Sequence, residues 1–133
     1  MIKHPKIKEW ENNLKSLFDE IDDFLEDKYG SLYPLHPVRP PRGTTSNKEM
    51  DGLFNVGASF EAGFGTKYGH GYVVDIHMST LEKVPDKIRK RIDRNVERLI
   101  KKKLKVFFPG RKLKVARDGN TFKIYGDLKL GVM

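Results

Sequence analysis

The 133-residue sequence predicts an α+β fold in which two amphipathic helices cover one face of a four-stranded antiparallel sheet. Two observations support this prediction. Two segments have apolar residues that recur every three or four positions, and two pairs of segments alternate between apolar and polar residues. Each alternating pair is joined by a short link containing glycine, which is typical of a β-hairpin. The predicted order is α-ββ-α-ββ, in a single domain spanning residues 1–133.

The first predicted helix spans residues 6–29. Pro5 suits its first turn, and Gly30 suits the left-handed position after its last turn. The face opposite the apolar stripe is acidic. The stripe is wider than a coiled-coil seam, which favours packing on a core over pairing with a second helix. The stripe consists of Ile7, Trp10, Leu14, Leu17, Phe18, Ile21, Phe24 or Leu25, and Tyr29.

Residues 31–52 are predicted to connect the first helix to the sheet. Four prolines between residues 34 and 41 exclude a helix and most sheet pairing, so this part of the chain should be extended. Residues 43–52 are small and polar. A PxxP-type ligand is one interpretation, and a stiff connector packed along the body of the protein is the favoured one.

Residues 53–64 and 71–80 predict the first hairpin. Its glycine-rich link lies between two strands and lacks a GK[ST] sequence, so it is not a phosphate-binding loop of the kind that precedes a helix. Lys67, Tyr68 and His70 are expected to project from the tip, either in a plain turn or as contacts to a base or ligand. The predicted inward face carries Phe54, Val56, Ala58, Phe60, Ala62, Phe64, Tyr72, Val74, Ile76 and Met78.

The second helix is predicted over residues 84–105, with Pro85 at its first position and Pro109 beyond its end. Its buried stripe is Ile88, Ile92, Val96, Leu99 and Leu104, with Ile100 at the edge. The second hairpin is predicted over residues 111–117 and 120–130, with Asp118 and Gly119 as its loop. That loop would place Val115 opposite Phe122 and Leu113 opposite Ile124.

Charge is distributed very unevenly along the chain. The net charge is +8, but residues 1–30 carry 5 Lys and 8 acids, whereas residues 81–133 carry 17 Lys and Arg and 6 acids. The chain has no cysteine, which excludes disulfides and thiolate chemistry and indicates a reducing cytoplasm. No signal peptide, membrane span, metal site or cofactor is predicted.

The second helix carries a basic face, because residues 82–105 contain eleven bases and only four acids. Such a face can follow a nucleic-acid backbone over several phosphates. Two other interpretations stay open: a solvated face with internal ion pairs, and neutralisation by the acidic first helix. The predicted contact residues on the helix are Lys87, Arg91, Arg94, Arg98, Lys101 (or Lys102 in its place) and Lys105.

The outward face of the second hairpin is predicted to add Lys112, Lys114, Lys123 and Tyr125 to this surface. Basic side chains beside an aromatic ring suit a nucleic-acid platform. Lysine on an edge strand is also an ordinary protection against aggregation. The residues do not match the signatures of an RRM, a KH domain, a dsRBD or a zinc finger.

Glu61, Asp75 and His77 are the candidate catalytic residues, on the outward face of the first hairpin. Carboxylates and a histidine on neighbouring strands can bind a divalent metal or transfer protons. The spacing matches no known metal or nucleophile motif, and polar residues on a solvent-facing sheet are ordinary.

The sequence therefore favours a small, basic, cytoplasmic and non-catalytic module that contacts a polyanion, RNA or DNA above all. The first alternative is a homo-oligomeric or partner-binding protein in which the acidic N-terminal helix covers a basic surface. The second alternative is a metal-dependent phosphodiester hydrolase.

Overall fold

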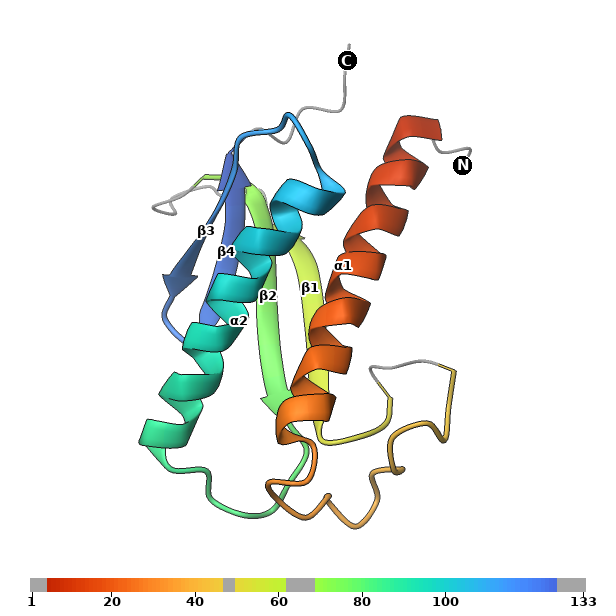
Figure 1. The fold of residues 1–133 in the computed structure, drawn as a ribbon, viewed down its shortest axis with the longest axis vertical. Helices are drawn as coiled ribbons and strands as arrows, with labels where there is room; N and C mark the ends of the chain where they lie inside the picture. The colour runs from red at the N-terminus through yellow and green to blue at the C-terminus, as the bar shows by residue number, and fades with distance from the viewer. Residues whose placement is uncertain (1–4, 47–49, 62–68, 127–133) are drawn as a thin grey trace.

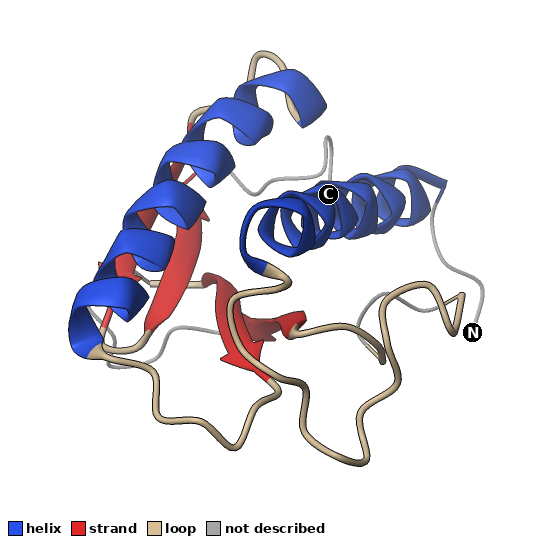
Figure 2. Ribbon diagram, turned by 60° about the horizontal axis from the view of Figure 1, so that its bottom comes forward, coloured by secondary structure: helices blue, strands red, loops and turns tan. Residues whose placement is uncertain are grey.

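The computed structural model of the protein describes residues 5–46, 50–61 and 69–126. Both helices lie on one face of a single sheet (Figures 1 and 2). The predicted α+β class and the order α-ββ-α-ββ are confirmed. The elements are α1 (Pro5–Tyr29), β1 (Phe54–Glu61), β2 (Gly71–Met78), α2 (Asp86–Phe107), β3 (Leu113–Asp118) and β4 (Thr121–Gly126). Neither helix has the run of apolar residues that a membrane-spanning segment requires.

Neighbouring strands are antiparallel throughout, and their order across the sheet is β1-β2-β4-β3. Hence β1 and β3 are the two edges. β1 pairs with β2 along its full length, whereas β4 pairs with only the first half of β2, Gly71 to Val74. Past the first residue of β4, the guanidinium of Arg89 on α2 donates a hydrogen bond to the carbonyl of Ile76. A helix side chain therefore donates a hydrogen bond to a backbone carbonyl of β2 that β4 does not reach.

The hydrophobic core lies between the helices and the sheet. Trp10 joins its parts near the start of α1: its Nε1 donates to the hydroxyl of Tyr72 at 3.0 Å, and its ring lies 4.3 Å from that of Phe108. Phe108 follows the end of α2, so one tryptophan fastens α1 to both β2 and α2. On α2 the buried apolar residues are Ile92, Val96, Ile100 and Leu104, while Ile88 and Leu99 are half-buried. Ile100 thus belongs to the stripe itself.

The predicted inward face of β1 is buried only in part, which corrects the expectation from alternation. Phe54 and Val56 are buried, but Ala58 is exposed and Phe60 is 59% exposed. The reason is the course of α1, which contacts Tyr72 of β2 near its start and Phe54 of β1 near its end. Because Tyr72 pairs with Phe60, the helix lies over β2 at that level and leaves the end of β1 uncovered.

The second hairpin has a different loop from the predicted one. Asp118 pairs with Thr121, so the loop is Gly119–Asn120, and Val115 lies opposite Ile124 rather than Phe122. Gly119 has φ +63°, whereas no described residue other than glycine has a positive φ. A glycine at the first loop position with positive φ is typical of a type II′ turn. The shift moves the pairing by two residues, so the apolar face is unchanged.

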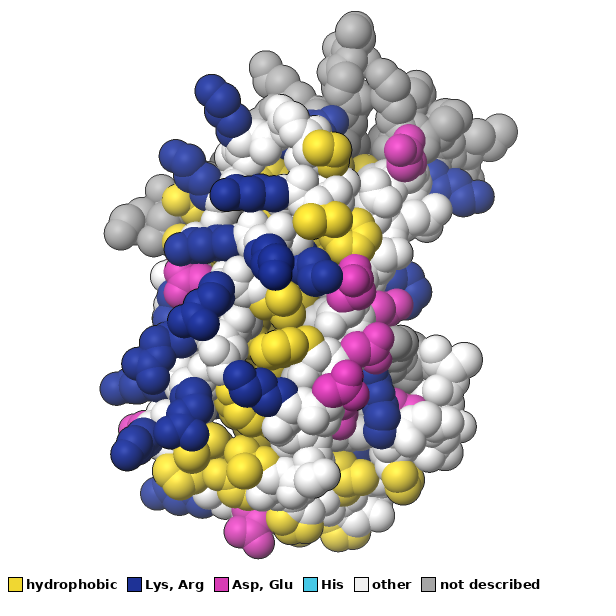
Figure 3. Space-filling view, in the orientation of Figure 1, with side chains coloured by type: hydrophobic (Ala, Val, Ile, Leu, Met, Phe, Trp, Pro, Cys, Tyr) yellow, Lys and Arg dark blue, Asp and Glu magenta, His cyan; other side chains and the backbone are white. Residues whose placement is uncertain are grey.

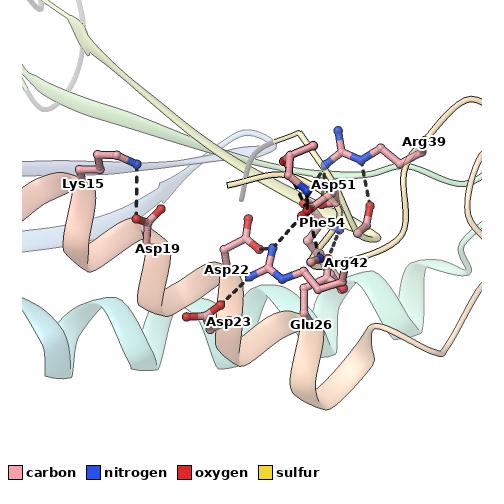
Figure 4. A network of polar contacts seen from close by, with 12 residues as sticks. Lys15, Asp19, Asp22, Asp23, Glu26, Arg39, Arg42, Asp51 and Phe54 are labelled. Carbon is pink, nitrogen blue, oxygen red and sulfur yellow. Dashed lines mark hydrogen bonds and ion pairs between the residues drawn. The ribbon is translucent and has the colours of Figure 1, made fainter. Parts of the chain in front are cut away.

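The connector is fastened to α1 and β1 by two arginines (Figure 4). Arg39 donates to the carbonyls of Gly52 and Asp51 at 2.9 Å. Arg42 binds Asp22 of α1 at 2.6 Å and its neighbour Asp23 at 2.5 Å. These contacts hold the described part of the proline-rich segment against the body of the protein.

Burial perturbs the carboxyl groups around Arg42. It raises the pKa of Asp22 to about 7, against the attraction of Arg42. Burial also raises the pKa of Glu26, opposed by the N–H of Phe54, which donates to the carboxylate at 2.7 Å. Burial acts on Asp51 in the same direction, but the N–H groups of Thr45 and Gly43, together with Arg42, hold the pKa of Asp51 below its usual value.

Candidate functional site

One side of α2 presents a continuous row of cations to solvent. The row runs about 27 Å from Lys87 to Lys105 at 1.5 Å per residue, and it lies opposite the buried residues Ile92, Val96 and Ile100. In the space-filling view, Lys and Arg side chains gather on the α2 side of the molecule, and acidic side chains gather over α1 (Figure 3). We call the row the α2 basic stripe; its exposed members are Lys87, Lys90, Arg91, Arg94, Arg98, Lys101, Lys102 and Lys105.

Carboxylates hardly neutralise the α2 basic stripe. Lys101 lies 3.5 Å from Glu97 on the same helix. Within the described part of the chain, the other seven members have no carboxylate within ion-pair distance. An exposed pair such as Lys101–Glu97 adds little stability and is screened by salt. The stripe therefore carries a net positive charge that solvent or an external anion must balance.

Helix α1 does not neutralise the stripe within the same chain. Its Glu20 binds Lys103, at 3.0 Å, but Lys103 lies on the flank of α2 rather than in the stripe. Asp22 and Asp23 are engaged by Arg42 on the connector side of α1. Among the described residues, the hypothesis of self-neutralisation therefore applies to Lys103 and fails for the stripe.

Lys123 is not an exposed cation, contrary to the sequence prediction. Its side chain is 1% exposed, and its ammonium lies 3.0 Å from the carboxylate of Glu61. The four-carbon stem crosses the sheet from β4 to β1 over Gly71, where an added Cβ would lie 3.1 Å from Cε of Lys123. A glycine on the intervening strand thus leaves the path clear. Lys123 is therefore not part of the exposed surface that was predicted to contact a ligand.

The remaining cations of the second hairpin lie on the other side of the sheet from α2. Val115 and Ile124 are buried under the helices, so Lys114 and Tyr125, which alternate with them, point to the face of the sheet opposite the helices. Lys112 and Lys114 are exposed, and Tyr125 is half-buried. The α2 basic stripe and these lysines therefore form two separate surfaces rather than one.

A second polar cluster lies beside the stripe, at the turn between β3 and β4. Asp93 of α2 is buried and lies 3.1 Å from Arg117 and 3.8 Å from Arg89. Burial raises the pKa of Asp93, and the two arginines oppose that rise. The cluster borders a cavity of about 360 Å³ that Asn120 and Asp75 also line. Arg89 and Arg117 are consequently fixed by an internal acid, and they do not extend the stripe.

The three candidate catalytic residues are not brought together. Asp75 pairs with Gly57, four residues before Glu61, which separates the two carboxylates by about 13 Å along the strand. Asp75 and His77 are neighbours on one face, while Glu61 is held by Lys123. No group of three acidic or histidine side chains suited to a metal occurs in the described ranges. The predicted cluster is therefore wrong as a geometric unit.

Of the three predicted loop contacts, Lys67 and Tyr68 lie outside the described residues. His70 is exposed, and its ring centroid lies 6.5 Å from that of Phe60. Lys90 is a stripe member that the sequence did not lead us to expect, and Lys102, expected only as an alternative to Lys101, belongs to the stripe together with it. Their positions on the helical wheel, within about 60° of the stripe axis at 100° per residue, could have identified them.

Another cavity is distinct from the stripe. It has a volume of about 710 Å³ and lies between the connector and the end of β2. Val38, Pro40 and Met50 give it apolar walls, with His36 and His77 at its margin. The backbone N–H of His36 donates to the carbonyl of Ser79. This bond holds the connector beside the end of β2, so that His36 and His77 line the same cavity. None of the stripe residues lines this cavity.

The chain matches a family model and a known protein of similar length. A family model described as "Uncharacterised protein" matches residues 5–126. A protein of Borreliella burgdorferi (strain ATCC 35210 / DSM 4680 / CIP 102532 / B31), named "Uncharacterized protein", is 37% identical over 121 residues, which cover 91% of this chain and 94% of that protein. No solved structure matches the chain.

Proposed function

This chain belongs to the family described as "Uncharacterised protein", and we propose that it is a non-catalytic, cytoplasmic module that binds the phosphate backbone of RNA or DNA through the α2 basic stripe. The observation that carries the proposal is the row of seven exposed cations without a carboxylate partner in the described structure. A row of cations on a rigid helix can neutralise successive phosphates and release their counterions.

The arrangement of the acidic residues supports an external anion over an internal one. The net charge of +8 is concentrated on the half of the molecule that contains α2. The acids of α1 nearest the connector are occupied by Arg42, as the ion pairs at 2.5 and 2.6 Å show. A ligand with many negative charges in a line is the partner that best matches this distribution.

The proposal predicts binding that depends strongly on salt and weakly on sequence. If four or five stripe residues each neutralise a phosphate, the slope of log K against log salt is about −4 for a duplex. Phosphate contacts position the ligand without reading its bases, so duplexes of different sequence should bind alike. The stripe contains no aromatic residue that could stack on an exposed base.

The test is a pair of charge-matched double variants. Arg94→Glu with Arg98→Glu reverses two charges in the middle of the stripe, and Lys112→Glu with Lys114→Glu reverses two exposed charges at β3, away from the stripe. All four side chains are exposed, so thermal unfolding should barely change. Binding to a labelled 20-base-pair duplex is measured by fluorescence anisotropy from 25 to 200 mM salt.

We expect the stripe variant to weaken binding to every sequence and to reduce the salt slope by about 2, one unit for each lost contact. The sheet variant should retain most of the parental affinity. Equal loss in both variants would show that net charge, rather than the stripe, governs binding. If the parent binds neither RNA nor DNA at 25 mM salt, the proposed function is wrong.

A further inference from the structure

The two edges of the sheet differ in their protection. Edge strands expose unpaired backbone groups, and proteins commonly block them with charged side chains. β3 carries Lys114 and Arg117 within the strand, with Lys112 just before it. β1, with the sequence FNVGASFE, has Glu61 as its one charged residue, and Glu61 is held by Lys123. The β1 edge thus lacks the charges that guard β3.

The hydrogen bonds at the start of β1 establish which residues face outward. The carbonyl of Leu53 accepts a hydrogen bond from the N–H of Ser79, so the backbone polar groups of Leu53 point toward β2. The N–H and carbonyl of Phe54 point away from β2, because they bind Glu26 at 2.7 Å and Arg39 at 3.2 Å. Since backbone direction alternates along a strand, the groups of Ala58 and Phe60 also point outward.

Side chains from α1 and the connector cap Phe54, but nothing described caps the second half of this edge. No hydrogen bond joins the outward N–H or carbonyl groups of Ala58 and Phe60 to any described residue. Both residues are exposed, and Phe60 is 59% exposed. The end of β1 therefore offers the backbone N–H and carbonyl groups of two residues, Ala58 and Phe60, for pairing with another strand, together with a large exposed ring.

A groove adjoins this edge on the helix side of the sheet. It has a volume of about 360 Å³ and lies between α1 and β1. Leu14, Phe18, Ala58 and Tyr72 give it an apolar floor. Glu11, Lys15 and Asp19 stand at its rim, where Lys15 and Asp19 form an ion pair at 3.4 Å. An aromatic side chain placed opposite Ala58 would reach this groove.

We propose that the β1 edge pairs with the β1 edge of a second copy of this chain, in antiparallel orientation about a two-fold axis at Ser59. In this register each Ala58 lies opposite Phe60 of the other copy, and outward-pointing residues meet outward-pointing residues. The two pairs exchange four backbone hydrogen bonds. Each Phe60 then lies over the groove beside Ala58 of the other copy, so one contact is made twice, as two-fold symmetry requires.

Charge favours a second copy as the occupant. The groove rim holds two acids and one lysine, and β1 carries no charged residue from Phe54 to Phe60 that the acids could repel. The α2 basic stripe lies toward the β3 edge of the sheet, since α2 contacts β3 whereas α1 contacts β1. The stripes of the two copies therefore face away from each other, which limits their repulsion.

The size of the contact sets its strength. The two Ala58–Phe60 pairs and their rings bury less surface than the roughly 1,200 Å² of a standard stable interface. The association is therefore weak and depends on protein concentration. Sedimentation from 10 µM to 1 mM should show a monomer–dimer equilibrium. The dimer does not depend on nucleic acid and is measured without it.

Two experiments test the pairing. The chain has no cysteine, so Ser59→Cys introduces a single thiol on the proposed axis, where opposed residues lie about 4.5 Å apart between Cα atoms. Under mild oxidation we expect this variant to form a disulfide-linked dimer at least tenfold faster than Ser31→Cys, an exposed serine outside the edge. Equal rates for the two variants would refute the register.

The second experiment compares Phe60→Lys with Leu81→Lys. Each places a lysine at an exposed apolar residue, 59% and 74% exposed respectively, and each adds one charge. We expect Phe60→Lys to weaken self-association by about tenfold or more, through loss of the buried ring, and Leu81→Lys to leave it unchanged. A parent that is monomeric at 1 mM overturns the proposal and leaves the edge to an extended segment of another protein.

Discussion

Replacing Asp22 with asparagine should remove a large pH dependence of stability. The pKa of Asp22 is about 7 in the folded protein and 3.8 in a model peptide. Between these pH values the folded state holds a proton that the unfolded state has released, so stability falls as pH rises through 7. The contribution is complete below pH 3.8 and absent well above pH 7.

The magnitude follows from the size of the pKa shift. Each pH unit between the two values corresponds to about 1.4 kcal/mol. Raising the pH from 5 to 8 therefore lowers the free energy of unfolding of the parent by about 2–3 kcal/mol through Asp22. The asparagine variant cannot ionise, so its stability relative to the parent should rise by that amount over the same range.

The assay is urea denaturation of the parent and the variant at pH 5, 6, 7 and 8. Taking the difference between the two proteins cancels the titration of groups that do not interact with Asp22, such as Asp93, whereas Glu26, whose charge raises the pKa of Asp22, contributes to the difference. Asp23→Asn is the matched control, because Asp23 also binds Arg42 but its side chain is 45% exposed. A difference between parent and Asp22→Asn that is constant from pH 5 to 8 would show that Arg42 keeps Asp22 ionised throughout.

Three further outcomes are expected from single variants. Gly119→Val should destabilise the protein by about 1 kcal/mol or more, because valine resists the φ of +63° at this position, and an unchanged Tm would contradict the turn assignment. Glu61→Gln should cost up to about 3 kcal/mol by leaving the Lys123 ammonium unpaired, less than in a fully buried pair because Glu61 is 35% exposed, whereas Lys123→Met should cost less. Chemical denaturation distinguishes the two, and equal costs would mean that the pair is solvated. Asp75→Asn should leave Mn²⁺ binding, measured by calorimetry, the same as in the parent, since the strand register separates Asp75 from Glu61; a site abolished by this variant would revive the hydrolase hypothesis.

Local patterns were sufficient to predict the helices, strands and glycine turns. The stripe from Trp10 to Tyr29 identified α1 to within one residue at its N-terminal end, and the α2 basic stripe followed from the same periodicity. Both depend on the spacing of side chains along one helix, which neighbouring elements do not change. The charge asymmetry between the two ends of the chain is likewise a property of the sequence alone.

The tertiary structure decided which of these residues reach solvent and which reach each other. Alternation placed Phe60 inside and Lys123 outside, and both predictions were wrong. Phe60 is exposed because α1 crosses from β2 to β1 and misses the end of the edge strand. Lys123 reaches Glu61 because Gly71, on the strand between, leaves room for its side chain. Each outcome depends on elements that are tens of residues away in the sequence. A local pattern does not encode the register of those strands or the direction in which the helix crosses them.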